Sequence, residues 1–443
     1  MTTTAASLRA RIPRIDQYIT ALESQLTLLR AEKEEILRDL DSIVFPVLTL
    51  PCDIVSEIFL HVSAQIPMDD FSRPQQTLAL ASVCRAWRAV ALSTCALWNR
   101  VTISCDSARE PGKLLQAWLP RAGRIPLDLH VCLAFQSCHA ILSILYQYSS
   151  RWRNVTLTSE EFFGLSDDFP SALNSLESLT IHEIYFETYK EFASSHCIAP
   201  RLRELSIESE MHQLGLPLTS LTILKLIGPS FAEILPILVL APNLKHLIVG
   251  VYGGPHSITP PSLVLPHLSM LECTDGQAAK LLDYLTLPAL TCLKLFDVDV
   301  ASLASCVSRS HCKVHALDLS YTTFDHVYAC VMSLPTITDL TLTGLEPESS
   351  YDSLEGFCTA MESGSCLPTL ESLSLCEWRP DKDVNSLFRA VATRYRGVEG
   401  TVKLKNFTLM FATYSWIDPG LEILYELKKE GLQLHLHGVR LAT

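Results

Sequence analysis

A short apolar phrase recurs along most of the chain and constrains its fold more than any other feature. The phrase has the form Leu-x-x-Leu-x-Leu, as in Leu221 to Leu226 and Leu290 to Leu295. Its second apolar position falls at 179, 205, 224, 247, 271, 293, 317, 340 and 373, so most steps lie in the twenties. A period of this length with alternating apolar residues predicts one short strand per repeat. Weaker copies at 101–103, 127–129 and 155–157 place the start of the array directly behind Trp98.

Proline marks the entry to many of these strands. It stands two residues before the phrase at Pro200, Pro242, Pro266, Pro288, Pro335 and Pro368. Because proline ends a helix and favours extended backbone before it, these positions predict where each strand begins. The last repeat predicts a strand at 407–410, a helix from Asp418 to about Glu430, a stop at Gly431 and a strand at 432–436.

The repeats resemble the leucine-rich-repeat family, whose fold is a curved solenoid with a parallel sheet on its concave side. The resemblance implies that strand residues between the leucines line this concave surface and bind a protein target. These residues are Glu204, Ser206, Glu208, Lys225, His246, Glu272, Lys294, Phe296, Asp318, Asp339 and Thr341. The family's Asn or Cys three residues beyond the second strand leucine is replaced by Ile184, Glu210, Pro229, Tyr252, Gly276, Val298, Thr322, Leu345 and Trp378. We therefore expect an irregular array.

Residues 8–45 predict a coiled-coil helix. Apolar residues fall at 8, 12, 15, 19, 22, 26, 29, 36, 40 and 43, and Lys33 is the one interruption. Alternating steps of four and three are typical of a coiled-coil seam. Pro13 predicts the start of the helix and Pro46 its end. Two interpretations remain open, self-association through residues 15–43 or a helix folded back on the next domain, and mixed Ile and Leu leave the oligomer number undecided.

Residues 47–100 predict a small helical unit with an uncovered apolar side. Its first helix has Pro51 in the first turn and carries two apolar stripes, Leu50, Ile54 and Ile58 on one side and Val55, Phe59 and Val62 on another. A second helical run is predicted over 78–91. A unit this small buries little core, so its remaining apolar side is expected to need a partner.

In their order these residues resemble the F-box family: Leu50-Pro51, Ile54, Ile58-Phe59, Val83-Cys84-Arg85, Trp87-Arg88 and Leu97-Trp98. In that family the segment is a helical domain that binds a Skp-type adaptor, which in turn joins a cullin–RING ubiquitin ligase. Carried over by position, the resemblance implies that the adaptor contacts are Leu50, Pro51, Ile54, Ile58 and Val83, and that Phe59, Trp87 and Trp98 form the core. Asp53 stands where the family usually has Glu. The longer interval before Val83, with an apparent insertion at 66–76, resembles a subgroup abundant in fungi, and the insertion is predicted to be a surface turn.

Composition excludes several classes of function. The net charge of −13 argues against non-specific nucleic-acid binding, which needs a basic surface. Fifteen cysteines without a C-x-x-C pair predict reduced thiols in the cytoplasm or nucleus, and Cys306, His311 and Cys312 are too loosely grouped for zinc. The first eight residues have no apolar secretory region, and the longest apolar run, 234–241, is too short for a bilayer, so we expect no membrane partner.

No recognised catalytic or nucleotide-binding motif occurs, so we expect no enzyme activity, cofactor or metal. Asp297 with Asp299 and His435 with His437 are interpreted as polar surface. The sequence thus predicts an α/β chain (α+β overall): a heptad helix at 8–45, an F-box-like helical domain at 47–100, and a degenerate leucine-rich-repeat solenoid at 101–443. Two functions stay open: a substrate-recognition adaptor of a Skp–cullin–F-box ligase, or a protein-binding scaffold whose F-box-like helices cap the repeats. A third hypothesis, an enzyme in the C-terminal third, has no motif to support it.

Overall fold

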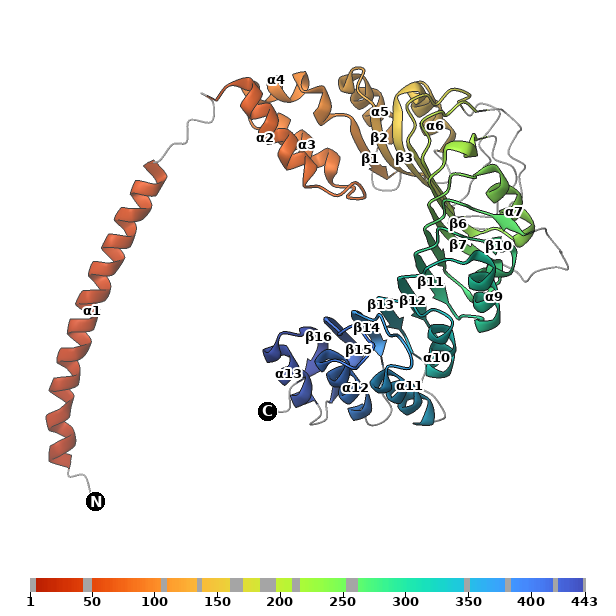
Figure 1. Ribbon diagram of the computed structural model, residues 1–443. Helices are drawn as coiled ribbons and strands as arrows, with labels where there is room; N and C mark the ends of the chain where they lie inside the picture. Colours follow the sequence, from red (N-terminus) through yellow and green to blue (C-terminus); the bar gives the residue numbers. More distant parts are fainter. Residues whose placement is uncertain are drawn as a thin grey trace.

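Fourteen parallel strands follow one another in chain order and form one long curved sheet, with helices along its outer side (Figure 1). The structure is a computed structural model that describes residues 5–42, 50–104, 110–133, 138–159, 170–183, 197–208, 216–251, 262–345, 351–378, 384–416 and 421–440. The strands of the sheet are β1 (Arg100–Ser104), β2 (Leu127–Leu133), β3 (Trp152–Ser159), β4 (Ser178–Glu183), β5 (Glu204–Glu208), β6 (Ile223–Gly228), β7 (His246–Val251), β9 (Met270–Cys273), β11 (Cys292–Phe296), β12 (Ala316–Ser320), β13 (Asp339–Thr343), β14 (Ser372–Trp378), β15 (Asn406–Trp416) and β16 (Gln433–Arg440). A separate two-stranded sheet pairs β8 (Leu263–Val264) with β10 (Leu285–Thr286).

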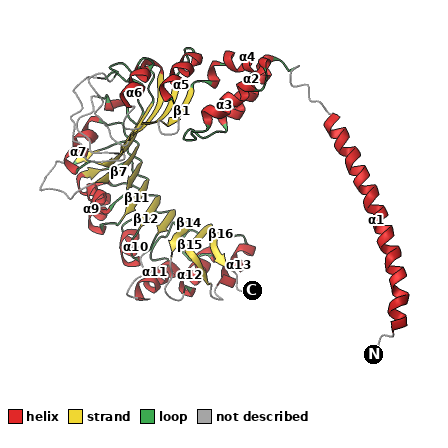
Figure 2. Cartoon of the chain, turned by 180° about the vertical axis from the view of Figure 1, so that it is seen from behind, coloured by secondary structure: helices red, strands yellow, loops and turns green. Residues whose placement is uncertain are grey.

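Helices lie along the outer side of the sheet in both views (Figures 1 and 2). Those that follow β1 in the chain are α5 (Pro111–Trp118), α6 (Cys138–Tyr146), α7 (Phe231–Leu240), α8 (Gly276–Ala279), α9 (Val300–Ser310), α10 (Phe324–Met332), α11 (Tyr351–Ser363), α12 (Asn385–Arg396) and α13 (Leu421–Glu430). Before β1 come α1 (Ala5–Ser42), α2 (Cys52–Ala64), α3 (Arg73–Ser82) and α4 (Arg85–Ser93). The described part of the chain contains no helix long and apolar enough to span a membrane.

The repeated leucines form the core between the sheet and its helices. They lie opposite one another across neighbouring strands, for example Leu224 opposite Leu247 and Leu271 opposite Leu293. All four are fully buried. The alternation of buried and half-buried residues in β6, β11 and β12 confirms the strands that the repeat phrase predicts. Burying one leucine side chain contributes about 2 kcal/mol, so rows of them hold the sheet and the helices together.

The turns that follow the strands, where the leucine-rich-repeat family has an Asn or Cys, are stabilised differently in this chain. Asp297 and Tyr321 directly follow β11 and β12 with φ of 51° and 53°, and Gly344 occupies the same place after β13 with φ of 59°. The N–H groups of Asp297, Tyr321 and Gly344 donate to carbonyls of the next strand, at 2.9 to 3.0 Å. A left-handed residue after each of these strands therefore continues the backbone hydrogen bonds without the missing asparagine. Val298, Thr322 and Leu345 then turn inward and are buried.

The helix predicted in the last repeat is confirmed to within a few residues, because the residue that ends it, Gly431, directly follows it in the sequence. Helix α13 ends at Glu430, and Gly431 follows with φ of 115°, a conformation that favours glycine. The helix begins at Leu421 and the returning strand at Gln433. The predicted cap, Asp418, lies outside the described residues.

Helix α1 is longer at its start than the sequence predicts. It begins at Ala5, and Pro13 lies within it. Its end at Ser42 agrees with a stop before Pro46. Every side chain described in α1 is exposed, so over these residues the helix does not fold back on the rest of the chain.

Candidate functional site

Helix α2 presents one apolar side to the protein and another to solvent. Val55 and Phe59 are buried, 5% and 0% exposed, and Phe59 contacts Trp87 edge to face with ring centroids 5.0 Å apart. On the other side Ile54 is 49% and Ile58 is 45% exposed. The two predicted stripes thus lie on different sides of one helix, except that Val62 of the inner stripe is 40% exposed. The outer stripe has no cover within the described residues.

The other predicted adaptor contacts are also exposed. Leu50 is 39% and Val83 is 62% exposed, and Pro51 is exposed at the start of α2. Pro51 occupies the N-cap position rather than the first turn. We call Leu50, Pro51, Ile54 and Ile58 the apolar helix face, and Val83 is exposed separately at the end of α3.

The predicted single helix over 78–91 is wrong, because the chain breaks between Val83 and Arg85. Cys84 is extended, with φ of −154°, and its Sγ accepts a hydrogen bond from the backbone N–H of Trp87 at 3.4 Å. Cys84 thus caps α4 in the place where Ser or Asp would be expected, which is why the sequence pattern did not reveal it. The break leaves Val83 at the corner between α3 and α4.

The predicted surface turn at 66–76 is partly wrong, since Arg73 and Pro74 are buried in the first turn of α3. The Arg73 guanidinium donates to the carbonyl oxygens of Ser63 at 2.9 Å, of Pro67 at 3.2 Å, and of Ile66. Burial lowers the pKa of Arg73 to about 10, so the group stays protonated at neutral pH. Arg73 therefore fastens the inserted segment to the end of α2.

The insertion also contacts the sheet. The hydroxyl of Thr102 in β1 donates to the carbonyl of Met68 at 2.8 Å, and Phe71 lies against His130 of β2 with ring centroids 5.4 Å apart. The inserted segment therefore contacts the end of α2 through Arg73, and the first two strands of the sheet through Met68 and Phe71.

Trp98 joins the helical unit to the first repeats. It is 1% exposed, its Nε1 donates to the carbonyl of Ala91 at 2.7 Å, and its ring lies 4.6 Å from that of Trp118. The Nε1 of Trp118 donates back to the carbonyl of Trp98 at 3.0 Å. One continuous core therefore runs from Val55 and Phe59 into the leucines of the sheet.

The second candidate surface is the concave face of the sheet, which we define as the strand side chains that point away from the helices. Ser206 and Lys225 are paired across β5 and β6, and Glu272, Lys294, Asp318 and Thr341 follow one another across β9 to β13. The other predicted positions lie two residues before or after this row on their strands, and therefore on the same face: Glu204, Glu208, His246, Phe296 and Asp339. Glu204 and Asp339 are exposed, Ser206 is 8% exposed, and the rest are half-buried. The register thus brings the predicted residues together on one surface.

Charges on the concave face form ion pairs between neighbouring strands. Glu208 accepts from Lys225 and is bonded to His182 Nδ1 at 2.7 Å. Lys294 Nζ lies 3.7 Å from the carboxylate of Glu272. The Asp318 carboxylate is half-buried, and burial raises its pKa, although nearby Lys294 opposes this. His182, absent from the predicted set, was missed because its partner is distant in sequence.

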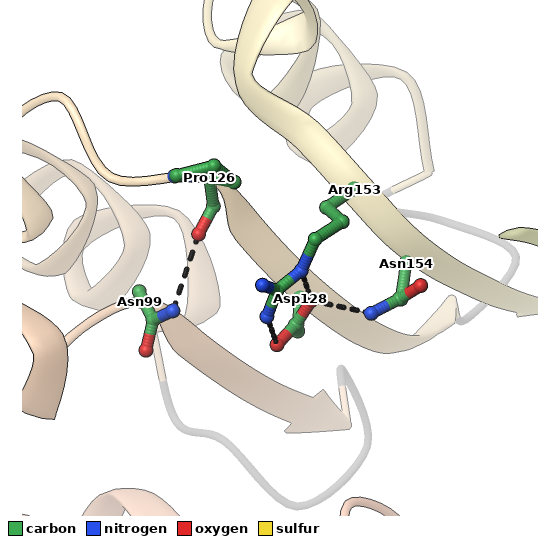
Figure 3. Close-up of polar contacts among 5 residues, drawn as sticks. All are labelled: Asn99, Pro126, Asp128, Arg153 and Asn154. Atoms are coloured by element: carbon green, nitrogen blue, oxygen red, sulfur yellow. Dashed lines mark hydrogen bonds and ion pairs between the residues drawn. The ribbon is translucent and has the colours of Figure 1, made fainter. Parts of the chain in front are cut away.

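A further polar cluster near the start of the sheet was also missed (Figure 3). The guanidinium of Arg153 donates to both oxygens of Asp128, at 2.9 and 2.5 Å, and the amide of Asn154 donates to one of them at 2.8 Å. These bonds raise the pKa of Arg153, with the Asp128 hydrogen bond as the largest cause. Asn99 donates to the carbonyl of Pro126 at 3.2 Å in the same view. The cluster links β2 and β3 beside the helical unit.

The described residues contain no group of three or more His, Cys, Asp or Glu side chains placed to hold a metal ion. Asp299 caps α9 by accepting from the N–H of Ala301 at 3.0 Å. His435 and His437 are exposed on β16. The thiols of Cys330 and Cys358 are buried, which raises the pKa of each to about 12. Such thiols stay protonated and unreactive at neutral pH.

Replacing Glu208 with Gln should cost little stability and should change its pH dependence. Burial by itself would raise the pKa of Glu208, but hydrogen bonds from Lys225 and His182 outweigh it and hold the pKa below 4.5. Because the folded-state pKa is depressed, the stabilisation is present above 4.5 and is lost as the pH falls through the folded pKa. For half-exposed ion pairs we expect a loss of less than about 1 kcal/mol at neutral pH.

Urea unfolding of the wild type and of Glu208→Gln, at neutral pH and below 4.5, measures this effect. The difference in unfolding free energy should shrink on acidification. Glu204→Gln, at an exposed position on the same strand, is the control. A difference that is equally large at both pH values would contradict the assignment.

Comparison with known proteins places this helical unit in a family. Residues 47–104 match the family model described as F-box-like, so the match includes α2, α3, α4 and the first strand β1. Domains of this family generally bind Skp-type adaptors. No curated protein matches the chain.

Proposed function

We propose that the protein is the substrate-recognition subunit of a Skp–cullin–F-box ubiquitin ligase. The observation that carries this proposal is the apolar helix face, where Ile54 and Ile58 are about half-exposed on an F-box-like domain. Solvent-exposed isoleucines adjacent on one helix are typical of a surface that a partner covers. The partner is a Skp-type adaptor, and through it a cullin–RING ligase. Such a complex, together with free thiols, suits the reducing environment of the cytoplasm or nucleus.

The repeats provide the second half of the proposal. We interpret the curved sheet as a degenerate leucine-rich-repeat solenoid of the fungal F-box type, with an unidentified target protein on its concave face. The alternating charges of Glu208, Lys225, Glu272, Lys294 and Asp318 suit a polar protein surface. The chain itself would do no covalent chemistry. It would hold the target near the transfer enzyme and so raise the effective concentration of the acceptor. Self-association through residues 15–43 would give each dimer two target-binding surfaces.

A second function, a repeat scaffold with a helical cap, is favoured by the junction at Trp98. The core of the helical unit is continuous with that of the sheet, which supports a role for α2 to α4 in covering the open end of the repeats. An uncovered end would expose leucines and aggregate. Capping and adaptor binding use different sides of α2, so one unit can do both.

Replacing Ile54 with Asp should abolish most adaptor binding without unfolding the protein. The side chain is 49% exposed, so the charge is tolerated in the free chain but would be buried in the complex. We expect affinity for a purified Skp-type adaptor to fall by about 2–3 kcal/mol, roughly 30- to 150-fold. Titration calorimetry with the full chain measures this loss.

Val239→Asp is the matched control, because Val239 is also exposed, at 61%, but lies on α7 outside the F-box-like domain. It should bind the adaptor as the wild type does. Equal binding by the wild type and Ile54→Asp, or no binding by the wild type, would exclude the ligase proposal. Deleting residues 1–98 tests the scaffold alternative, since a soluble and folded remainder would show that no cap is needed.

A further inference from the structure

Helix α1 carries an uncovered apolar seam along most of its length. The seam residues within the described side chains are Ile12, Ile15, Ile19, Leu22, Leu26, Leu29 and Ile36, and they are 47% to 64% exposed. A helix without tertiary packing is only marginally stable in water, since most helical stability in proteins comes from burying an apolar face. The seam therefore needs an occupant.

The spacing of the seam indicates that the occupant is another helix with the same repeat. Steps of three lead from Ile12 to Ile15, from Ile19 to Leu22 and from Leu26 to Leu29, so the first of each pair is an a position and the second a d position. Lys33 then falls at an a position. Strict 3.5-residue periodicity makes two such helices supercoil and interlock, whereas a helix lying on a globular core drifts away from this pattern.

We propose that α1 pairs with α1 of a second copy of this chain, in parallel and in register, as a two-stranded coiled coil. In this arrangement every described seam layer is apolar except one, which holds both copies of Lys33. An antiparallel pair centred on the seam would instead place each Lys33 opposite Ile15 and so disturb two layers. A two-stranded seam also lets the long Lys33 stems reach water, which a larger bundle would hinder.

Charges beside the seam favour the same arrangement. In a parallel pair the g position Arg11 faces the e position Asp16 of the other copy, and Lys33 lies beside Glu32 of the other copy. In the antiparallel pair Glu23 would instead face Glu23 at the centre. Both registers pair opposite charges, since the antiparallel pair would place Asp16 opposite Arg30. The parallel register is favoured because it avoids the Glu23–Glu23 contact and leaves Lys33 with an acidic neighbour in its polar layer.

The proposed pairing of α1 does not depend on the proposed function, but it has a consequence for that function. A helix of 38 residues extends over about 57 Å, so an antiparallel pair would separate the two F-box-like domains by that order of distance. A parallel pair places both at the same end. Two concave faces would then engage a target with two binding segments, with avidity beyond either alone.

Sedimentation equilibrium of the full chain tests the pairing. The wild type should have the mass of a dimer at micromolar concentration, and Leu22→Asp with Leu29→Asp should be a monomer, with dimer affinity lowered at least about 100-fold. Leu28→Asp is the matched control, because Leu28 is 71% exposed on the same helix but lies off the seam. It should remain a dimer.

A charge exchange tests the orientation. Asp16→Arg should weaken the parallel dimer about tenfold, since Arg11 would then face a second arginine, and adding Arg11→Asp should restore it. In the antiparallel pair Asp16 faces Arg30, so the second change would not restore binding. A monomeric wild type, a trimer, a dimer that survives both leucine changes, or failure of the exchange would each overturn the proposal. Adaptor binding by the monomeric variant separates this result from the test of the ligase proposal.

Discussion

Replacing Trp98 with Ala should destabilise the protein by about 3–5 kcal/mol, the largest effect we expect from a single change. Trp98 is 1% exposed between the helical unit and the first repeats. The change removes an aromatic contact with Trp118, leaves the carbonyl of Ala91 without its indole donor, and opens a cavity at this junction. Because α2 to α4 are held by this core, adaptor binding should fall with stability.

Trp98→Phe separates packing from hydrogen bonding. It keeps a ring against Trp118 but cannot donate to Ala91, so we expect a loss of about 1–2 kcal/mol. Urea unfolding followed by circular dichroism gives both values. If Trp98→Ala cost no more than Trp98→Phe, the tight packing at this junction would be disproved.

Replacing Arg73 with Met should cost about 3 kcal/mol and should loosen the inserted segment in particular. Met fills similar volume, but the buried carbonyls of Ser63, Ile66 and Pro67 would lose their donors. No carboxylate is hydrogen-bonded to the guanidinium among the described residues, so the change leaves no acid unpaired. The loss is therefore one of hydrogen bonds rather than of an ion pair.

Arg73→Lys is the control, since it keeps the charge but has a single donor centre in place of the planar fork. It should recover only part of the lost stability. Amide hydrogen exchange should show faster exchange over 66–72 in Arg73→Met, while β11 to β13 remain protected. Uniform loss of protection across the sheet would contradict a local role for Arg73.

Features of the candidate site that depend on residues close together in the sequence could be predicted, and features that depend on distant residues could not. The exposed stripe of Ile54 and Ile58 was predicted from helical periodicity, which needs no knowledge of distant contacts, whereas Pro51 and Val83 were assigned as adaptor contacts only from the resemblance to the F-box family. The buried position of Arg73 was not predicted, because a charged residue among prolines and aspartates is typical of a turn. Its burial becomes understandable only when three carbonyls converge on it in space. The same holds for Cys84, a weak acceptor that caps α4 because the corner at Val83 places it there.

On the concave face, periodicity predicted which side chains share the surface but not which of them meet. Glu208 and Lys225 were expected on one face, but their contact, and that of His182 through the pairing of β4 with β5, was not predicted. Asp128 and Arg153 meet for the same reason across β2 and β3.

By itself the sequence determined the repeat strands, their order and the side of each strand that is buried, since these depend on apolar spacing over a few residues, but it did not reveal the division of the second helical run into α3 and α4. The tertiary structure alone decided the ion pairs between strands, the left-handed turns after β11, β12 and β13, and the core that joins Trp98 to the repeats. Those features depend on atoms brought together across many residues of chain. Side-chain chemistry along one segment carries no information about which distant partner the fold will supply.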